Sequence, residues 1–187
     1  MKKKTLILVI VLAVVLIAVI AVITTYNGMV SAKESVDTAF STIDTQLQRR
    51  ADLIPNLVST VKGYAAHEQA AIDSVTEARA QLAGAQTVGE KGAANTELTN
   101  ALSRLLVVVE NYPNLKANEN FIALQDELAG TENRIAVARK DYNDVVRSYN
   151  TRIKSFPTNI FAGMFGFSAA EYFEADATDK DVPEVTF

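Results

Sequence analysis

The sequence predicts an all-α protein, with an N-terminal transmembrane helix followed by an antiparallel up-and-down four-helix bundle of long helices. Three observations favour this fold class. An uncharged apolar run opens the chain. Apolar residues then recur at heptad spacing over long stretches, as they do in helices that pack against one another. Only four prolines and eight glycines interrupt the 187 residues, and no alternating strand pattern is present.

The apolar run has the composition and length of a membrane span. No charge, glycine or proline occurs from Leu6 through Val14 to Ile23, and a helix needs roughly 20 apolar residues to cross a hydrocarbon core of about 30 Å. A cleaved signal peptide is the alternative, but its apolar region usually covers only about 7–15 residues. The one acceptable cleavage site, at residues 30–32, is distant from the run. We therefore assign residues 1–25 to a cytoplasmic stub and a transmembrane signal-anchor.

Charges predict the orientation of the span and exclude some partners. Lys2, Lys3 and Lys4 precede the span, and short positively charged segments stay in the cytoplasm. The N-terminus is therefore expected in the cytoplasm and the rest of this single-pass chain outside it. The net charge is −4 and no basic patch stands out, which argues against nucleic acid as a partner. Cysteine is absent, which excludes disulfides and thiolate metal sites.

Three of the four bundle helices follow the span in order. The first is expected over residues 26–50, which carry one apolar stripe. The second is expected over residues 55–83, because Pro55 suits the first turn of a helix. One continuous helix kinked at Pro55 is the alternative. A loop with three glycines at residues 84–94 then precedes the third helix, at residues 95–111.

The fourth helix carries the clearest pattern. Large apolar or aromatic residues recur at every seventh position: Phe121, Leu128, Ile135, Tyr142, Tyr149 and Phe156. Such a coiled-coil seam is expected to be buried against neighbouring helices, and Pro157 ends it. Two Tyr-Asn pairs lie along this helix, at 142–143 and 149–150. We interpret the tyrosines as core residues whose hydroxyl needs a partner and the asparagines as candidates to fix helix register.

Polar residues gather in two turns that the topology brings together. Short connections make consecutive helices antiparallel, so the turns near residues 50–56 and 112–120 are expected at the end of the bundle far from the membrane. The candidate binding tip consists of Arg49, Arg50, Asp52, Asn56, Tyr112, Lys116, Asn118 and Asn120. We favour the interpretation that these residues cap helix ends and hold the turns together. Binding of a partner or an anionic group is the alternative.

The segment 156–173 is aromatic but aperiodic, and the same topology returns it to the membrane side. Its candidates for shallow insertion into the membrane interface are Phe161, Phe165 and Phe167. We favour the alternative, in which the segment covers the open end of the bundle. The bundle domain is thus expected over residues 26–174, and the acidic tail at 175–187 is expected to be disordered.

Residues suited to catalysis or metal binding are sparse. His67 is the only histidine, and position 64 is Tyr64 rather than the glutamate that a Glu-x-x-His metal site requires. No Gly-x-Ser-x-Gly nucleophile motif and no phosphate-binding loop occurs. The sequence therefore predicts no catalytic residues, no metal, no cofactor and no enzymatic activity.

Several motifs resemble the LemA family. They are Arg49 to Val58 (RRADLIPNLV), Thr60 to Ala65 (TVKGYA), Tyr112 to Asn118 (YPNLKAN), Thr131 to Ala136 (TENRIA) and Phe156 to Asn159 (FPTN), together with the two Tyr-Asn pairs. The likeness extends over nearly the whole chain from Tyr26 to Phe173, although Asn114 stands where the family often has an acidic residue. It implies a bacterial protein with an N-terminal transmembrane helix and a helical bundle outside it. It implies no catalytic residues and no defined biochemical role.

We therefore expect a non-enzymatic scaffold or adaptor of the bacterial cell envelope, held in the plasma (inner) membrane. Its expected partners are the lipid bilayer and other envelope proteins. Homo-oligomerisation through exposed heptad faces is a further option. The alternative is a ligand-sensing bundle that binds a small molecule at the tip and works with a separate membrane signalling partner.

Overall fold

All regular structure in the part of the chain that the structure describes is helical. The structure is a computed structural model that describes residues 2–174. Six helices and no strand occur in this range, which confirms the all-α class. The tail at 175–187, for which disorder was expected, lies outside the described residues.

The chain divides into two compact units. The first comprises Met1–Thr38 and Asp144–Ala170, and the second comprises Ala39–Asn143 and Glu171–Phe187. Two long helices contribute to both units. These are α1 (Lys2–Lys62) and α5 (Glu119–Lys154).

Helix α1 continues through Pro55, so the predicted turn at residues 50–56 is wrong and the alternative of one continuous helix is observed. Proline has no N–H, so the carbonyl four residues earlier loses its helical donor. That carbonyl belongs to Ala51, and it accepts a 2.8 Å hydrogen bond from Nε of Arg79 on α2 (Gln69–Gly84) instead. A side chain from a second helix therefore satisfies the group that the proline would leave unpaired.

Helix α3 (Val88–Val109) begins earlier than predicted, and the predicted loop at 84–94 shrinks to residues 85–87. A capping box starts the helix. The Thr87 side chain accepts a hydrogen bond from the Glu90 N–H (3.2 Å), and the Glu90 carboxylate accepts one from the Thr87 N–H (2.9 Å). Hydrogen bonds from the backbone N–H groups of Thr87 and Gln86 lower the pKa of Glu90. The stabilisation from this capping box thus outweighs the destabilising effect of the two glycines in the first turns of α3.

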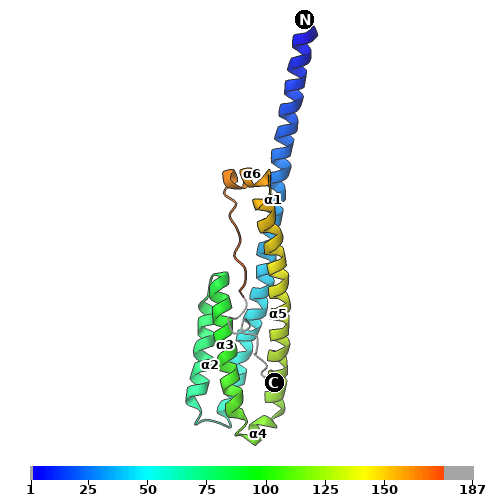
Figure 1. Cartoon of the computed structure of the whole chain (residues 1–187). Helices are drawn as coiled ribbons and strands as arrows, with labels where there is room; N and C mark the ends of the chain where they lie inside the picture. The colour runs from blue at the N-terminus through cyan, green and yellow to red at the C-terminus, as the bar shows by residue number, and fades with distance from the viewer. Residues whose placement is uncertain (1, 175–187) are drawn as a thin grey trace, which may run out of the picture. The chain divides into compact units, whose positions relative to one another are not determined.

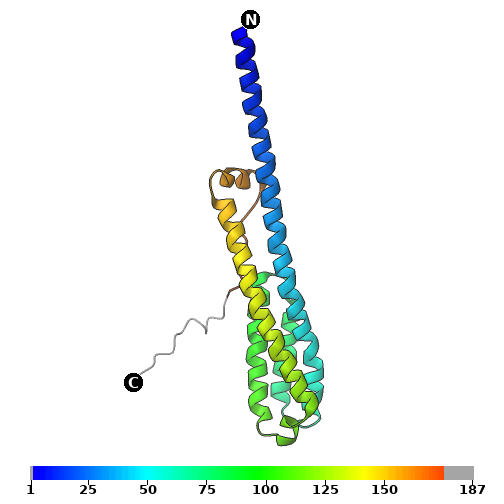
Figure 2. The same ribbon diagram turned by 90° about the vertical axis from the view of Figure 1, so that its right-hand side faces the viewer.

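The second unit is built from four helical segments that share one core. Figures 1 and 2 show α1, α2, α3 and α5 alongside one another in this unit, with short α4 (Pro113–Lys116) between α3 and α5. Its buried side chains come from all four segments: Ile43, Leu47, Ile54, Leu57, Ile72, Val75, Leu98, Leu105, Phe121, Leu128, Ile135 and Tyr142. The heptad seam of α5 is therefore buried as predicted, up to Tyr149. Phe156 departs from it, because it follows the last residue of α5 and is 81% exposed.

The first unit contains the apolar span. Residues 2–62 form the one helix, among those described, that is long and apolar enough to cross a membrane, and none of its most apolar stretch is buried within the protein. Helix α6 (Thr158–Phe165) belongs to the same unit and lies beside α1 in Figures 1 and 2. The candidate cleavage site at residues 30–32 lies inside α1.

Candidate functional site

The predicted tip residues lie in two parts of the chain, within α1 and from the end of α3 to the start of α5, and Asn56 and Asn120 line one groove between them. Arg49, Arg50, Asp52 and Asn56 lie within α1, not in a turn. Arg49 pairs with Glu127 at 2.5 Å, and the Asp52 carboxylate accepts a 2.8 Å hydrogen bond from Gln48. These residues therefore do not form the end of the second unit, because the helix that carries them continues to Lys62.

Two residues just beyond α1, Tyr64 and Glu68, instead anchor the end of this helix through hydrogen bonds. Neither was among the predicted site residues. The Tyr112 hydroxyl donates to Glu68 at 2.8 Å, and Asn118 donates from its amide to the Tyr64 hydroxyl at 3.0 Å. The Glu68 hydrogen bond raises the pKa of Tyr112, which keeps this phenol protonated as a donor. Gly63 directly after Lys62 was the available signal, since glycine commonly follows the last turn of a helix.

The remaining predicted tip residues serve local roles. Asn118 also accepts the Phe121 N–H at 3.0 Å at the start of α5, and Lys116 pairs with Glu110 at 2.5 Å. Asn120 is exposed beside them. The interpretation that this group caps helix ends and holds turns agrees with these contacts, which involve only residues of the chain itself.

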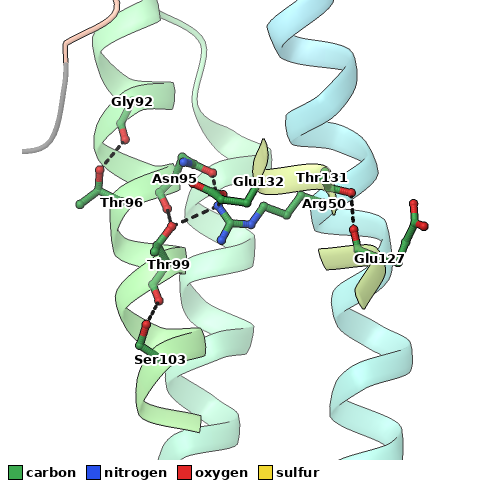
Figure 3. Close-up of polar contacts among 9 residues, drawn as sticks. All are labelled: Arg50, Gly92, Asn95, Thr96, Thr99, Ser103, Glu127, Thr131 and Glu132. Atoms are coloured by element: carbon green, nitrogen blue, oxygen red, sulfur yellow. Dashed lines mark hydrogen bonds and ion pairs between the residues drawn. The ribbon is translucent and has the colours of Figure 1, made fainter. Parts of the chain in front are cut away.

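Arg50 is the centre of a buried polar cluster inside the second unit (Figure 3). Its guanidinium donates to Asn95 (2.6 Å) and Thr99 (3.1 Å) on α3 and pairs with Glu132 on α5 at 2.5 Å. The Arg50 side chain is 4% exposed. It is therefore shielded from an anionic ligand in solvent, which argues against the binding alternative for this residue.

Burial dominates the electrostatics of this cluster. Loss of water around the guanidinium lowers the pKa of Arg50, and the nearby Glu132 carboxylate opposes that effect. The buried charge therefore depends on its partner. Because its three partners come from α3 and α5, the cluster joins three helices of the unit at one level. None of the three partners, Asn95, Thr99 and Glu132, was among the predicted site residues.

The Tyr-Asn pairs of α5 bind the C-terminal segment, residues 167–174, which has no regular secondary structure. Tyr142 and Tyr149 are buried, as predicted, and each hydroxyl has a partner. Burial raises the pKa of Tyr149; the charge of Lys33 lowers it and that of Asp37 raises it, each by less than burial does. The asparagines were candidates to fix helix register through bonds between helices, but these bonds are not the ones observed. Both bind backbone of the segment instead.

The aromatic segment packs against the end of the apolar run in the first unit. The rings of Phe165 and Phe167 lie 5.0 Å and 5.9 Å from the ring of Tyr26, centroid to centroid. Tyr26 follows Ile23 by one helical turn. Phe161 is half-buried. Phe165 is 44% exposed, and the side chains that extend furthest into solvent are Phe156, Ile160 and Met164.

No group of three or more His, Asp or Glu side chains in the described residues is placed to hold a metal ion. His67 is exposed in the connection between α1 and α2.

Comparison with known proteins assigns the family. The profile of the LemA family matches residues 39–187. The chain belongs to the LemA family. The matched range includes the buried Arg50 cluster and both Tyr-Asn pairs of α5.

Three bacterial relatives are similar to this LemA-family chain over most of its length. Magnetosome protein MamQ 2 of Paramagnetospirillum magneticum is 29% identical over 187 residues, covering 86% of this chain and 68% of the relative. Magnetosome protein MamQ of Magnetospirillum gryphiswaldense is 27% identical over 205 residues, covering 94% and 75%. Protein LemA of Metamycoplasma hominis is 22% identical over 163 residues, covering 85% and 74%.

Proposed function

We propose that this LemA-family chain is a non-enzymatic, membrane-anchored adaptor of the bacterial cell envelope. The observation that carries the proposal is the continuity of α1, in which one helix supplies both an exposed apolar span and core residues of the helical domain. A chain built this way holds a folded helical surface at a bilayer. The Arg50 guanidinium and the Tyr142 hydroxyl both bind groups of the chain itself, which favours a role in presenting a surface over a role in chemistry.

The orientation follows from the charges beside the span. Lys2, Lys3 and Lys4 place the N-terminus in the cytoplasm by the positive-inside rule. The helical domain then lies outside the cytoplasm, at the outer face of the plasma (inner) membrane. The magnetosome proteins among the relatives support the assignment to a membrane-associated bacterial assembly.

Helix α6 supplies a second membrane contact in this proposal. It belongs to the unit that contains the span, and Phe165 packs on Tyr26, one turn beyond the last apolar residue of the span. The outward side chains Phe156, Ile160 and Met164 are spaced by four residues and are 81%, 52% and 72% exposed. Helix α6 carries no charge. Apolar side chains at this level insert into the boundary between headgroups and acyl chains.

A single tryptophan tests this contact, because the chain contains none. In Phe156→Trp the emission is expected to shift to shorter wavelength in nanodiscs and to be quenched by brominated lipids. The matched control is Ser35→Trp. Ser35 is exposed on the same helix as the span, twelve residues and so about 18 Å beyond Ile23, and it should be unaffected by the lipid. Equal quenching at both positions, or none at either, contradicts the interfacial placement of α6.

Crosslinking in native membranes tests the adaptor role. Photoreactive side chains placed at the exposed positions Val107, Ile122 and Val137 of the second unit are expected to capture specific envelope proteins. A chain with the same label at the buried position Leu98 is the control. If no protein is enriched, and the purified chain instead shows a melting shift with a small molecule, the ligand-sensing alternative replaces the adaptor.

A further inference from the structure

We propose that α5 carries a binding site for an extended peptide, which the chain's own residues 167–174 occupy as an internal ligand. The external ligand is a partner's extended segment with one aromatic side chain at the place of Phe173. The inference deepens the proposed adaptor function and rests on it, because it states how a partner attaches.

The site in the second unit consists of Tyr142 and Asn143. The Tyr142 hydroxyl donates to the Glu171 carbonyl at 2.8 Å. The Asn143 side chain donates to the Phe173 carbonyl and accepts the Phe173 N–H, both at 2.9 Å. A side-chain amide that pairs with both backbone groups of one residue holds that residue as a neighbouring β-strand would.

The first unit contains a second site of the same kind. The Tyr149 hydroxyl donates to the Ser168 carbonyl at 2.9 Å. The Asn150 amide donates to the Ala170 carbonyl at 2.9 Å and accepts the Ala170 N–H at 2.8 Å. In both sites the asparagine binds the residue two positions after the one that the tyrosine binds.

The spacing of the pairs explains why the arrangement repeats. The Tyr-Asn pairs are seven residues apart on α5, and their backbone partners are three residues apart in the segment. Seven helical residues rise by about 10.5 Å, and three extended residues cover about 10 Å. A helix with Tyr-Asn at heptad spacing therefore matches the repeat of an extended chain.

These contacts do not depend on the sequence of the ligand. All six hydrogen bonds go to backbone atoms of the segment. The side chains of Glu171 and Tyr172 are exposed. The site therefore accepts many sequences in the extended conformation, since main-chain bonds supply affinity and side-chain pockets supply specificity.

One aromatic side chain supplies the specificity. Phe173 is 2% exposed, and Arg139 lies over its ring with the guanidinium carbon 5.0 Å from the centroid. Arg139 also donates to the Glu174 carbonyl at 2.8 Å. Gly92 on α3 faces the ring, and a Cβ there would lie 3.4 Å from it, in ordinary van der Waals contact. This pocket selects an aromatic residue at one position of an otherwise unselected segment.

Adding the segment as a separate peptide to the full-length chain tests the proposal. The probe is a fluorescent peptide with the sequence of residues 167–174. The variant Phe173→Ala weakens the chain's own segment and leaves the site intact, so it is expected to bind the peptide at least about tenfold more tightly than the wild type, the effect of burying one aromatic ring. Fluorescence anisotropy in detergent or nanodiscs measures this.

Two controls distinguish binding at this site from nonspecific binding of the peptide. A peptide with alanine at the place of Phe173 should bind the variant at least about tenfold more weakly than the probe does. Adding Asn143→Ala and Asn150→Ala to Phe173→Ala should remove binding of the probe. A second way to loosen the segment is Ala170→Pro, which removes the N–H that Asn150 accepts. Far-UV circular dichroism checks that each variant keeps the wild-type helix content.

Two results would overturn the proposal. In the first, folded Phe173→Ala and Ala170→Pro chains bind the probe no better than the wild type. In the second, binding survives the loss of both asparagines. The outcome is independent of partner capture in membranes. A chain that binds the probe but captures no envelope protein refutes the adaptor function alone, whereas capture without probe binding refutes the peptide site alone.

Discussion

Replacing Glu132 with alanine is expected to lower the free energy of unfolding by about 2–4 kcal/mol. The change leaves the charge of Arg50 buried, at 4% exposure, without its carboxylate partner. Burial already lowers the pKa of Arg50, and only Glu132 opposes that effect. We place the loss below that of a fully buried pair because the Glu132 side chain is 38% exposed. Denaturant titration of the full-length chain in micelles, followed by circular dichroism, measures the change.

Glu127 provides a matched control on the same helix. Its carboxylate pairs with Arg49 at 2.5 Å, but the Arg49 side chain is 55% exposed. Exposed ion pairs contribute about 0–1 kcal/mol, so Glu127→Ala should cost much less than Glu132→Ala. Adding Arg50→Met to Glu132→Ala should restore part of the loss, because it removes the unpaired charge. Equal losses for Glu127→Ala and Glu132→Ala would show that the buried cluster contributes no more than a surface pair.

Replacing Arg79 with alanine is expected to lower the free energy of unfolding by about 1–3 kcal/mol, the cost of an unpaired buried carbonyl. The carbonyl is that of Ala51, a residue that is 3% exposed, and Nε of Arg79 is its donor at 2.8 Å. Pro55 creates the need for this donor, because it has no N–H of its own to supply. The same denaturant titration measures the effect.

A double-mutant cycle identifies the cause. In Pro55→Ala the new N–H can donate to the Ala51 carbonyl, so this change alone should stabilise the chain by about 1–3 kcal/mol. In that background Arg79→Ala should cost less than about 1 kcal/mol, since the carbonyl keeps a partner. If Arg79→Ala costs the same with and without Pro55, Arg79 stabilises the unit through packing and not through the freed carbonyl.

Local sequence patterns predicted the helices correctly but misplaced two of the helix ends. The heptad of α5 spans residues 121–149 in the sequence, and its members are buried in the structure. The end of the first helix was misplaced by about a dozen residues, because Pro55 is normally a helix start or a break. The start of α3 was predicted too late in the chain, because Gly89 and Gly92 indicated a loop where Thr87 and Glu90 form a capping box.

The candidate sites were recovered less well than the helices. Arg50 was predicted as a residue of the polar tip. Its buried position depends on Asn95, Thr99 and Glu132, which are 45 or more residues away in the chain. The aromatic segment was predicted to be apolar and near the span; of its three candidate phenylalanines Phe165 is exposed, whereas Phe161 and Phe167 are half-buried, and the more exposed Phe156, Ile160 and Met164 were not selected. In both places the residue types indicated a site, but the sequence did not indicate which way the side chains point.

The sequence by itself determined the helical class, the apolar span and the buried seam of α5, because helix periodicity and span length are properties of neighbouring residues. The tertiary structure alone decided that α1 passes through Pro55, that Arg50 is an internal charge, and that the Tyr-Asn pairs hold an extended segment. Each of these depends on a hydrogen-bond partner at least 19 residues distant in the chain. No local pattern encodes such a partner, because folding alone brings its donor and acceptor together.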